Sequence, residues 1–295
     1  FWLFSADCDG NEDQLSEPAV LLGDMHFSTN TTSHHNITLS GVKFLQKTSD
    51  EQNCIHTDGT GGTLVISECA FEGNSTNDGR AILNKQGATV DVRDCSFDNL
   101  HTKYGAAIRN YGQITIKNST FSNNQASISG GAINNKGGMV IESSTFFGNQ
   151  AKFFGGAISD SAGGSVSAAI KATTFVENIS YQHGGAIFME NKVNAEVSRS
   201  TFEKNIAVRY YGGAIVAADS KLLASDNDFV ENKDKLVAGA IALATSTCKM
   251  QGNSFTNNTS RESGSEISKH VGKWDGASNF KCPDQGNTFI PSQHQ

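Results

Sequence analysis

The sequence repeats itself with a period of about 26 residues, and this repeat restricts the possible folds more than any other feature. One landmark is a phenylalanine that recurs every 24 to 29 residues, at Phe44, Phe71, Phe97, Phe121, Phe146, Phe175, Phe202, Phe229 and Phe255. A second landmark is an isoleucine that keeps the same spacing, at Ile55, Ile82, Ile108, Ile133, Ile158, Ile187, Ile215, Ile241 and Ile267. Because the two landmarks drift together, each repeat is one structural unit, and Phe280 extends the register into a degraded last unit.

Apolar residues alternate upstream of each phenylalanine, which predicts short strands with one buried face. The residues five positions before it are Leu39, Ile66, Val92, Ile116, Ile141, Ile170, Val197, Ala224 and Met250. Those seven positions before it are Ile37, Leu64, Val90, Ile114, Met139, Ala168, Ala195, Leu222 and Cys248. No helical period competes, so each unit is predicted to hold about three short strands separated by Gly, Asn and Ser turns.

Units of this length and composition predict an all-β chain, a single-stranded parallel β-helix of about nine to ten coils. Each strand would pair with its copy one coil later, at a spacing of ~4.8 Å. A leucine-rich horseshoe has a similar period, but its LxxLxL spacing and its helix are missing. We expect an N-terminal cap over residues 1–35, the repeats over 36–264 and a C-terminal cap over 265–295. The three prolines, Pro18, Pro283 and Pro291, lie outside the repeats, as paired strands require.

Two short motifs explain how the coils stack. Gly-Gly-Ala precedes the isoleucine in four units, beginning at Gly130, Gly155, Gly184 and Gly212, and predicts a corner where a Cβ would clash. An asparagine stands three residues after most of the phenylalanines and predicts a ladder of stacked amides. These are Asn74, Asn124, Asn149, Asn178, Asn205, Asn232 and Asn258. Stacked phenylalanines would form a continuous internal column.

Composition excludes several classes of function. The net charge is −7, which is the wrong sign for a general nucleic-acid binder. No apolar run reaches the ~18 residues that a membrane-spanning helix needs. The chain begins at Phe1 rather than Met, and we interpret this start as a mature N-terminus or an artificial boundary.

The GGAI and FxxN motifs recur in phase over residues 55–267 and resemble the repeats of the chlamydial polymorphic outer membrane protein family. This resemblance implies a right-handed parallel β-helix that is secreted or exposed at the cell surface. It also implies an adhesin that contacts other proteins or assembles with itself. It carries no catalytic residue to this chain. Members of that family end in a membrane β-barrel, and this sequence contains no such region.

Six cysteines without a close Cys-x-x-Cys pair favour disulfides over zinc. Cys69 and Cys95 occupy the same position in adjacent coils, where a ~4.8 Å spacing suits a disulfide. The alternative is a pair of stacked thiols that fill core space. Two further disulfides would tie down the caps, pairing Cys8 with Cys54 and Cys248 with Cys282.

Several Asn-x-Ser/Thr sequences are candidate glycosylation sites. Asn74, Asn178 and Asn258 belong to the predicted ladder, so we expect them to be buried and unmodified. The accessible candidates are Asn30, Asn36, Asn118 and Asn257. Chance offers the alternative explanation, because a chain rich in Asn, Ser and Thr yields several such sequences.

The segment between each ladder asparagine and the glycine corner is apolar or aromatic. Its residues are Tyr104, Ile128, Phe153, Phe154, Tyr181, Tyr210, Tyr211, Leu236 and Val237. Stacking would align them into a stripe along the rod, and we predict a partner or assembly surface there. The alternative is that the turn folds them inward as additional core. Since bulky residues come in tandem at two places, alternation would expose one of each pair.

The sequence favours a protein without catalytic residues, metal site or cofactor. Residues 56–59, His-Thr-Asp-Gly, resemble one motif of pectin hydrolases, but the accompanying Asp pair and His-Gly are missing at coil spacing. A lyase would need clustered Asp for Ca²⁺ and an Arg base, which the repeats do not supply. We therefore predict an extracellular adhesive or structural β-helix. A carbohydrate-binding or polysaccharide-degrading β-helix is the alternative.

Overall fold

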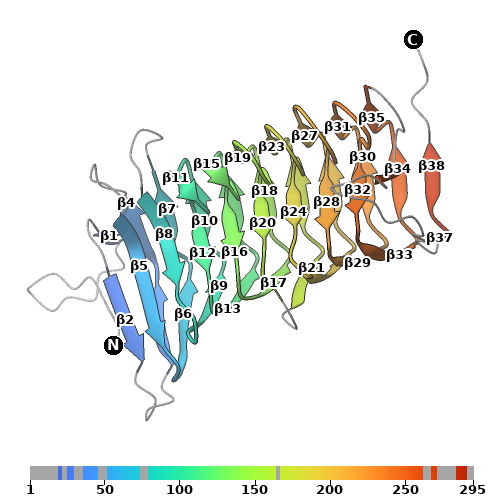
Figure 1. Cartoon of the computed structure of the whole chain (residues 1–295). Helices are drawn as coiled ribbons and strands as arrows, with labels where there is room; N and C mark the ends of the chain where they lie inside the picture. Colours follow the sequence, from blue (N-terminus) through green and yellow to red (C-terminus); the bar gives the residue numbers. More distant parts are fainter. Residues whose placement is uncertain are drawn as a thin grey trace, which may run out of the picture.

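The computed structural model describes residues 19–21, 25–29, 36–45, 52–73, 79–163, 167–261, 267–270 and 284–290. Within these ranges the chain is all-β, and it winds into a parallel β-helix whose coils lie side by side (Figure 1). Each strand pairs in parallel with the equivalent strand one coil later, as the repeat predicts. The solenoid has about eight turns, slightly fewer than the predicted nine to ten, because end strands extend some sheets without completing a turn.

Four sheets run along the rod, one more than the three strands per unit predict. The Phe sheet holds the landmark phenylalanines. It consists of β1 (Ala19–Leu21), β4 (Val42–Leu45), β7 (Ala70–Glu72), β10 (Ser96–Asp98), β14 (Thr120–Ser122), β18 (Thr145–Phe147), β22 (Thr174–Val176), β26 (Thr201–Glu203), β30 (Asp228–Val230), β34 (Ser254–Thr256) and β38 (Thr288–Ile290).

The Ile sheet follows each glycine corner. It consists of β2 (Met25–Thr29), β5 (Gln52–Gly59), β8 (Gly79–Asn84), β12 (Ile108–Asn110), β16 (Ile133–Asn135), β20 (Ile158–Asp160), β24 (Ile187–Met189), β28 (Ile215–Ala218), β32 (Ile241–Ala244) and β36 (Ile267–His270).

The long-strand sheet carries the alternating pattern found upstream of each phenylalanine. It consists of β3 (Ile37–Ser40), β6 (Thr63–Ser67), β9 (Thr89–Arg93), β13 (Gln113–Lys117), β17 (Gly138–Glu142), β21 (Ser167–Lys171), β25 (Asn194–Ser198), β29 (Lys221–Ser225), β33 (Thr247–Gln251) and β37 (Asp284–Gln285).

The short-strand sheet is the one that the sequence did not predict. It consists of β11 (His101–Tyr104), β15 (Gln125–Ser129), β19 (Gln150–Ala151), β23 (Ile179–Ser180), β27 (Ile206–Ala207), β31 (Lys233–Asp234) and β35 (Thr259–Ser260). Most of these strands have only two residues, which is too short for a period-two pattern to be visible in a sequence.

The phenylalanines form the predicted internal column. Neighbouring rings lie 4.6 to 5.1 Å apart between centroids, with interplanar angles of 1° to 9°, from Phe44 through Phe255 to Phe289. Every ring from Phe44 to Phe255 is fully buried. One expectation was wrong: Phe289 of β38, not Phe280, stacks on Phe255. The residues around Phe289, Gly-Asn-Thr-Phe, copy the Gly-Asn-Ser-Phe around Phe255.

The asparagine ladder is also confirmed, over the stretch from Asn124 to Asn258. Each Nδ2 donates to Oδ1 of the next asparagine at 2.9 Å, and each Oδ1 also accepts from the preceding asparagine's backbone N–H. A second donation from Nδ2 reaches the carbonyl of a phenylalanine one coil earlier, as from Asn178 to Phe146 at 3.0 Å. These buried amides therefore avoid the cost of an unpaired polar group. Asn74 lies outside the described residues.

The turns between strands contain residues with positive φ, both glycine and other types. The first glycine of each Gly-Gly pair has positive φ, and a Cβ on the second would collide with the backbone of the next coil, as predicted. Two further columns of positive φ flank each phenylalanine strand, three residues before the ring and two residues after it. They are filled mainly by residues other than glycine, including Glu68, Asp94, Ser143, Ala172, Arg199, Asn123 and Lys204.

The ends of the described chain continue the same sheets. β1 pairs with β4 and β2 with β5, within the region predicted as the N-terminal cap. β36, β37 and β38 pair with β32, β33 and β34 in the region predicted as the C-terminal cap. No helix in the described ranges is long and apolar enough to cross a membrane.

Candidate functional site

The segment between the short-strand sheet and the glycine corner is where the coils differ most from one another. Of the nine residues predicted as a partner surface, seven lie in this segment, and Tyr104 and Ile128 lie just before it, within β11 and β15. Tyr181 and Tyr210 are exposed, while the other seven, Tyr104, Ile128, Phe153, Phe154, Tyr211, Leu236 and Val237, are half-buried. The stripe is therefore neither fully exposed nor fully absorbed into the core, and its use as a contact surface stays a prediction.

Part of the stripe folds back over the outside of the Ile sheet. Phe154 and Tyr211 pack against Phe188 and Val216, which point outward from β24 and β28. The ring centroids of Phe154 and Phe188 lie 4.6 Å apart. This second apolar cluster lies outside the tube, and it explains why one residue of each tandem pair is turned inward.

His183 connects this cluster to the surface. Its ring stacks between Phe154 and Tyr210, at centroid distances of 5.7 and 5.0 Å. Burial lowers the pKa of His183 to about 4, because apolar surroundings disfavour the imidazolium form. At neutral pH His183 is therefore an uncharged ring within an aromatic stack.

An open groove lies beside the stripe, over the short-strand sheet. Its volume is about 420 Å³. Phe153 and Tyr181 supply rings, Gln125, Gln150 and Gln182 supply amides, and the remaining lining residues are His101, Ala126, Ser127, Ala151, Lys152 and Arg209. A groove with rings on one side and convergent polar groups is a common form of binding site.

The charged residues that line this groove are all positive. Lys152 and Arg209 contribute cations, and none of the groove's lining residues is a carboxylate. The ammonium group of Lys152 lies 5.4 Å from the centre of the Phe153 ring, within the range of a cation–π contact. Because it lacks paired carboxylates, the groove does not have the acid–base pair of a glycoside hydrolase.

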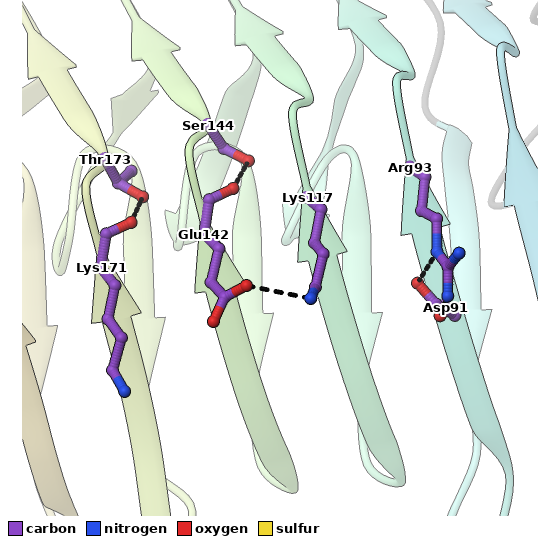
Figure 2. A network of polar contacts seen from close by, with 7 residues as sticks. All are labelled: Asp91, Arg93, Lys117, Glu142, Ser144, Lys171 and Thr173. Atoms are coloured by element: carbon purple, nitrogen blue, oxygen red, sulfur yellow. Dashed lines mark hydrogen bonds and ion pairs between the residues drawn. The ribbon is translucent and has the colours of Figure 1, made fainter.

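The outer face of the long-strand sheet carries charged residues, several of which pair with residues of opposite charge. Figure 2 shows Lys117 on β13 paired with Glu142 on β17 at 3.0 Å, and Arg93 bonded to Asp91 within β9. Nearby hydroxyls of Ser144 and Thr173 donate to carbonyls two residues earlier, at 2.9 Å. Exposed pairs of this kind contribute little to stability, and they place charges of both signs on this face.

A polar ladder that the sequence analysis missed runs inside the Ile sheet, two residues after the landmark isoleucine. Thr57 donates to Asn84, and the amides of Asn84 and Asn110 each donate to the next asparagine at 2.7 Å. Asn135 ends the series by donating to Asp160 at 3.0 Å. The asparagines recur at coil spacing, so the sequence did contain this signal.

Asp160 is the unusual member of this ladder. Its side chain is buried, its Oδ1 accepts from Asn135 and from the backbone N–H of Ala162, and its Oδ2 has no hydrogen-bond partner. Burial raises the pKa of Asp160 to about 6, although both hydrogen bonds act in the opposite direction. In the next coil Met189 replaces the polar residue.

Near the N-terminal end of the rod, the structure brings His26, His56 and Asp58 together. His26 of β2 pairs in register with His56 of β5, and Asp58 follows two residues later on the same face. The Nε2 atom of His26 lies 3.0 Å from Oδ2 of Asp58. In the sequence, His56 and Asp58 stand out only as part of a motif that resembles one from pectin hydrolases. His26 could not be recognised in the same way, because it precedes the first repeat landmark.

The predicted disulfides between Cys69 and Cys95 and between Cys8 and Cys54 are wrong, because Cys54, Cys69 and Cys95 are thiols. Cys95 Sγ accepts from the backbone N–H of Cys69 and donates to the Arg93 carbonyl at 3.1 Å. Parallel in-register strands hold the two Cβ atoms about one strand spacing apart, beyond the ~3.8 Å typical of a disulfide. The hydrogen bond with Cys69 and burial raise the pKa of Cys95, so it stays a thiol at neutral pH.

These thiols begin a second ladder, at the position two residues before each phenylalanine, which runs from Cys69 to Ser144 and from Thr173 to Asn287. Successive backbone N–H groups donate to a side chain of the next coil, first to sulfur, then to hydroxyls, then to amides. The acceptors are Cys95, Ser119, Ser144, Ser200, Asn227, Asn253 and Asn287. The mixed residue types conceal this column in the sequence.

The other cysteine and sequon predictions remain predictions. Cys248 is buried on β33 and is disulfide-bonded. Cys8 and Cys282 lie outside the described residues, so the predicted pairing of Cys248 with Cys282 stays a prediction. Asn178 and Asn258 are buried as expected. Asn36 and Asn118 are exposed, Asn257 is half-buried, and Asn30 lies outside the described residues.

Comparison with known proteins supports the fold and the repeat. Residues 151–274 match the family model of the right-handed β-helix region, and residues 118–136 match that of the Chlamydia polymorphic membrane protein repeat. No curated protein matches the chain.

Among solved structures, the PL6 family alginate lyase AlyGC matches over 81% of this chain and 35% of its own, with 11% identity and a TM-score of 0.45. The present chain thus spans about a third of that lyase. The A-module of the Azotobacter vinelandii mannuronan C-5 epimerase AlgE4 matches over 93% of this chain and 88% of its own, with 9% identity and a TM-score of 0.30. The A-module of AlgE6 from the same organism matches over 92% of both chains, with 8% identity and a TM-score of 0.35.

The matched repeat contains Asn124 of the ladder and the Gly130-Gly131-Ala132-Ile133 corner. These are the elements that stack the coils in the structure. The chain is therefore a right-handed parallel β-helix, and one of its repeats, residues 118–136, is similar to the Chlamydia polymorphic membrane protein repeat.

Proposed function

We propose that this chain is a secreted or cell-surface protein that acts by contact, as an adhesin or as a building block of an extracellular assembly. The observation that carries the proposal is the groove over the short-strand sheet, where Phe153 and Tyr181 stand beside amides and cations. A regular β-helix needs no such open, aromatic-lined surface for its own stability. Aromatic residues and arginine are the residue types enriched at protein–protein contacts.

The test is binding of the fluorescently labelled protein to cultured cells, together with sedimentation analysis of self-association. The double variant Phe153→Ala and Tyr181→Ala should lose most of the binding or self-association, since both rings face the groove. Phe147→Ala is the matched control, because Phe147 is also exposed but lies on β18 in the Phe sheet. Equal binding by the double variant and the wild type would contradict the proposal.

Carbohydrate binding is the second candidate, favoured by the combination of ring, amide and cation in one groove. Rings pack against sugar faces, amides bond hydroxyls, and Lys152 with Arg209 would favour an acidic sugar. Calorimetric titration with neutral and uronic-acid oligosaccharides tests this reading. Binding that the Phe153/Tyr181 variant loses supports it, and bond cleavage in the same samples would contradict a role by contact alone.

A further inference from the structure

We propose that His26, His56 and Asp58 form a binding site for a divalent transition-metal ion such as Zn²⁺, on the outer face of β2 and β5. This site is separate from the groove and does not depend on the contact function proposed above. It lies in the first two strands of the Ile sheet, whereas the groove is lined by residues of the short-strand sheet and its loops.

The register of the parallel strands brings the two histidines together. Parallel pairing sets His26 directly over His56, and their ring centroids are 4.7 Å apart at an interplanar angle of 45°. Asp58 is two residues beyond His56, so both side chains leave β5 on the same face. Three donors from two strands are therefore held by backbone hydrogen bonds rather than by a loop.

The three ligand atoms lie close enough together to hold one metal ion. One ligand atom from each of the three residues lies within 4.8 Å of the others. A tetrahedral Zn²⁺ site with bonds of about 2.0–2.1 Å places its ligand atoms about 3.3 Å apart. His26 and Asp58 already approach to 3.0 Å. The cluster must contract by at most about 1.5 Å to reach this geometry, and the exposed His26 can supply that movement by rotation of its side chain.

The ring of His56 has a nitrogen atom that makes no hydrogen bond. The Nε2 atom of His56 is buried and has no hydrogen-bond partner. In the next coil the same column is occupied by Leu83, so no polar ladder continues from His56 as it does from Asn84. A buried polar atom without a partner is rare and calls for an explanation, and a metal site that includes this ring provides one.

The chemistry of the donor atoms favours a transition-metal ion. Two imidazoles and one carboxylate suit Zn²⁺, Fe²⁺, Ni²⁺ or Cu²⁺, whereas Ca²⁺ and Mg²⁺ prefer oxygen ligands alone. Three protein ligands leave a position for water, as in open zinc sites. Lys85 is the opposing charge, since it acts electrostatically on both His56 and Asp58, and it should weaken the binding of a cation.

The test is calorimetric titration of the full chain with ZnCl₂ and, separately, visible absorption with CoCl₂. The wild type should bind one ion in a saturable step, and Co²⁺ should produce a d–d absorption band. Asp58→Asn, His26→Gln and His56→Gln should each weaken binding by at least ~10-fold, the loss seen even when an outer-shell partner is removed. Lys85→Gln should tighten binding.

His101→Ala is the matched control, because His101 belongs to the groove rather than to this cluster. It should bind Zn²⁺ as the wild type does. Asp58→Asn keeps the volume of a partly exposed side chain, and equal melting temperatures in a chelator would show that the fold is retained. If Asp58→Asn, His26→Gln and the wild type bind Zn²⁺ with the same affinity and stoichiometry, the proposal is overturned.

Discussion

At the scale of single residues, the structure tolerates local costs that stacking compensates. Ala172, Ser143 and Arg199 hold positive φ without being glycine, a conformation that costs about 1–2 kcal/mol for most residues. Asp160 is buried with one oxygen unbonded. The three positive-φ residues are exposed, and the backbone N–H of each donates to a carbonyl of the next coil at 3.0 to 3.1 Å, which helps to hold it in place.

Asp160→Asn should remove a pH dependence of stability. The pKa of Asp160 is raised to about 6 in the folded protein, above its unfolded value of about 3.9. The folded state therefore holds the proton more tightly, so this stability is fully present below about pH 4 and is lost as the pH rises through 6. The wild type should lose up to ~3 kcal/mol over this window through Asp160, at 1.36 kcal/mol for each pKa unit.

An amide at position 160 can donate where the carboxylate cannot. Asn135 uses its Nδ2 to donate to the carbonyl of Gly137, and the unbonded Oδ2 of Asp160 is the equivalent atom one coil later. The difference in unfolding free energy between Asp160→Asn and the wild type, measured by urea at pH 4 and pH 8, isolates this group from His183, which titrates in the opposite sense. A difference that does not change with pH would contradict the assignment.

Ala172→Gly should stabilise the protein by ~0.5–1 kcal/mol. Glycine relieves the strain of φ 49°, at ~1–2 kcal/mol, and adds a smaller entropic cost in the unfolded chain. Ala169→Gly is the matched control, because Ala169 lies within β21 and should instead lose ~0.5–1 kcal/mol. Chemical denaturation of both variants checks the opposite signs, and the same sign in both would refute the explanation.

At the scale of elements, each strand is stable only through its neighbours. The short strands of the Phe sheet have three residues in most coils, too few to persist alone. They are held by the ring column on one side and by two amide or hydroxyl ladders at their ends. The asparagine ladder and the column could be predicted, because both repeat one residue type, whereas the ladder before each phenylalanine changes from thiol to hydroxyl to amide.

Phe175→Ala should cost ~3–5 kcal/mol of stability, because it removes a fully buried ring and leaves a cavity. Its ring contacts Phe146 and Phe202 at 4.9 and 4.8 Å between centroids. Phe147→Ala, on the outer side of the same sheet, should change stability by less than ~0.5 kcal/mol. Thermal and urea unfolding give both values, and a near-neutral Phe175→Ala would show that the column contributes little.

At the scale of the whole molecule, the β-helix is nearly one-dimensional, since each coil contacts only the coils before and after it (Figure 1). Stability then depends on intact interfaces between neighbouring coils. A local break should therefore open the adjacent coils first and leave distant coils protected. This arrangement also leaves the loops free to vary, and two rings of the groove, Phe153 and Tyr181, belong to such loops.

Thr145→Pro should break the interface between β14 and β18. Thr145 donates its backbone N–H to the carbonyl of Ser119 at 2.9 Å, and proline removes this donor. We expect a loss of ~1–3 kcal/mol from the carbonyl left without its donor, with hydrogen exchange accelerated in β14 and β18 but not in β30 or β34. Thr145→Ser keeps the donor and should exchange as the wild type does. Uniform acceleration along the whole rod would contradict nearest-neighbour stacking.

The period of the sequence by itself determined the parallel β-helix, the Phe column, the main asparagine ladder and the glycine corners. In-register stacking explains this success, because a residue that recurs once per coil must meet its own copy above and below. The tertiary structure alone decided what happens where the coils differ: which stripe residues turn inward, the thiol state of Cys69 and Cys95, and the cluster of His26 with His56 and Asp58. Those outcomes depend on side-chain direction and on segments of unequal length, and neither is encoded in a repeat spacing.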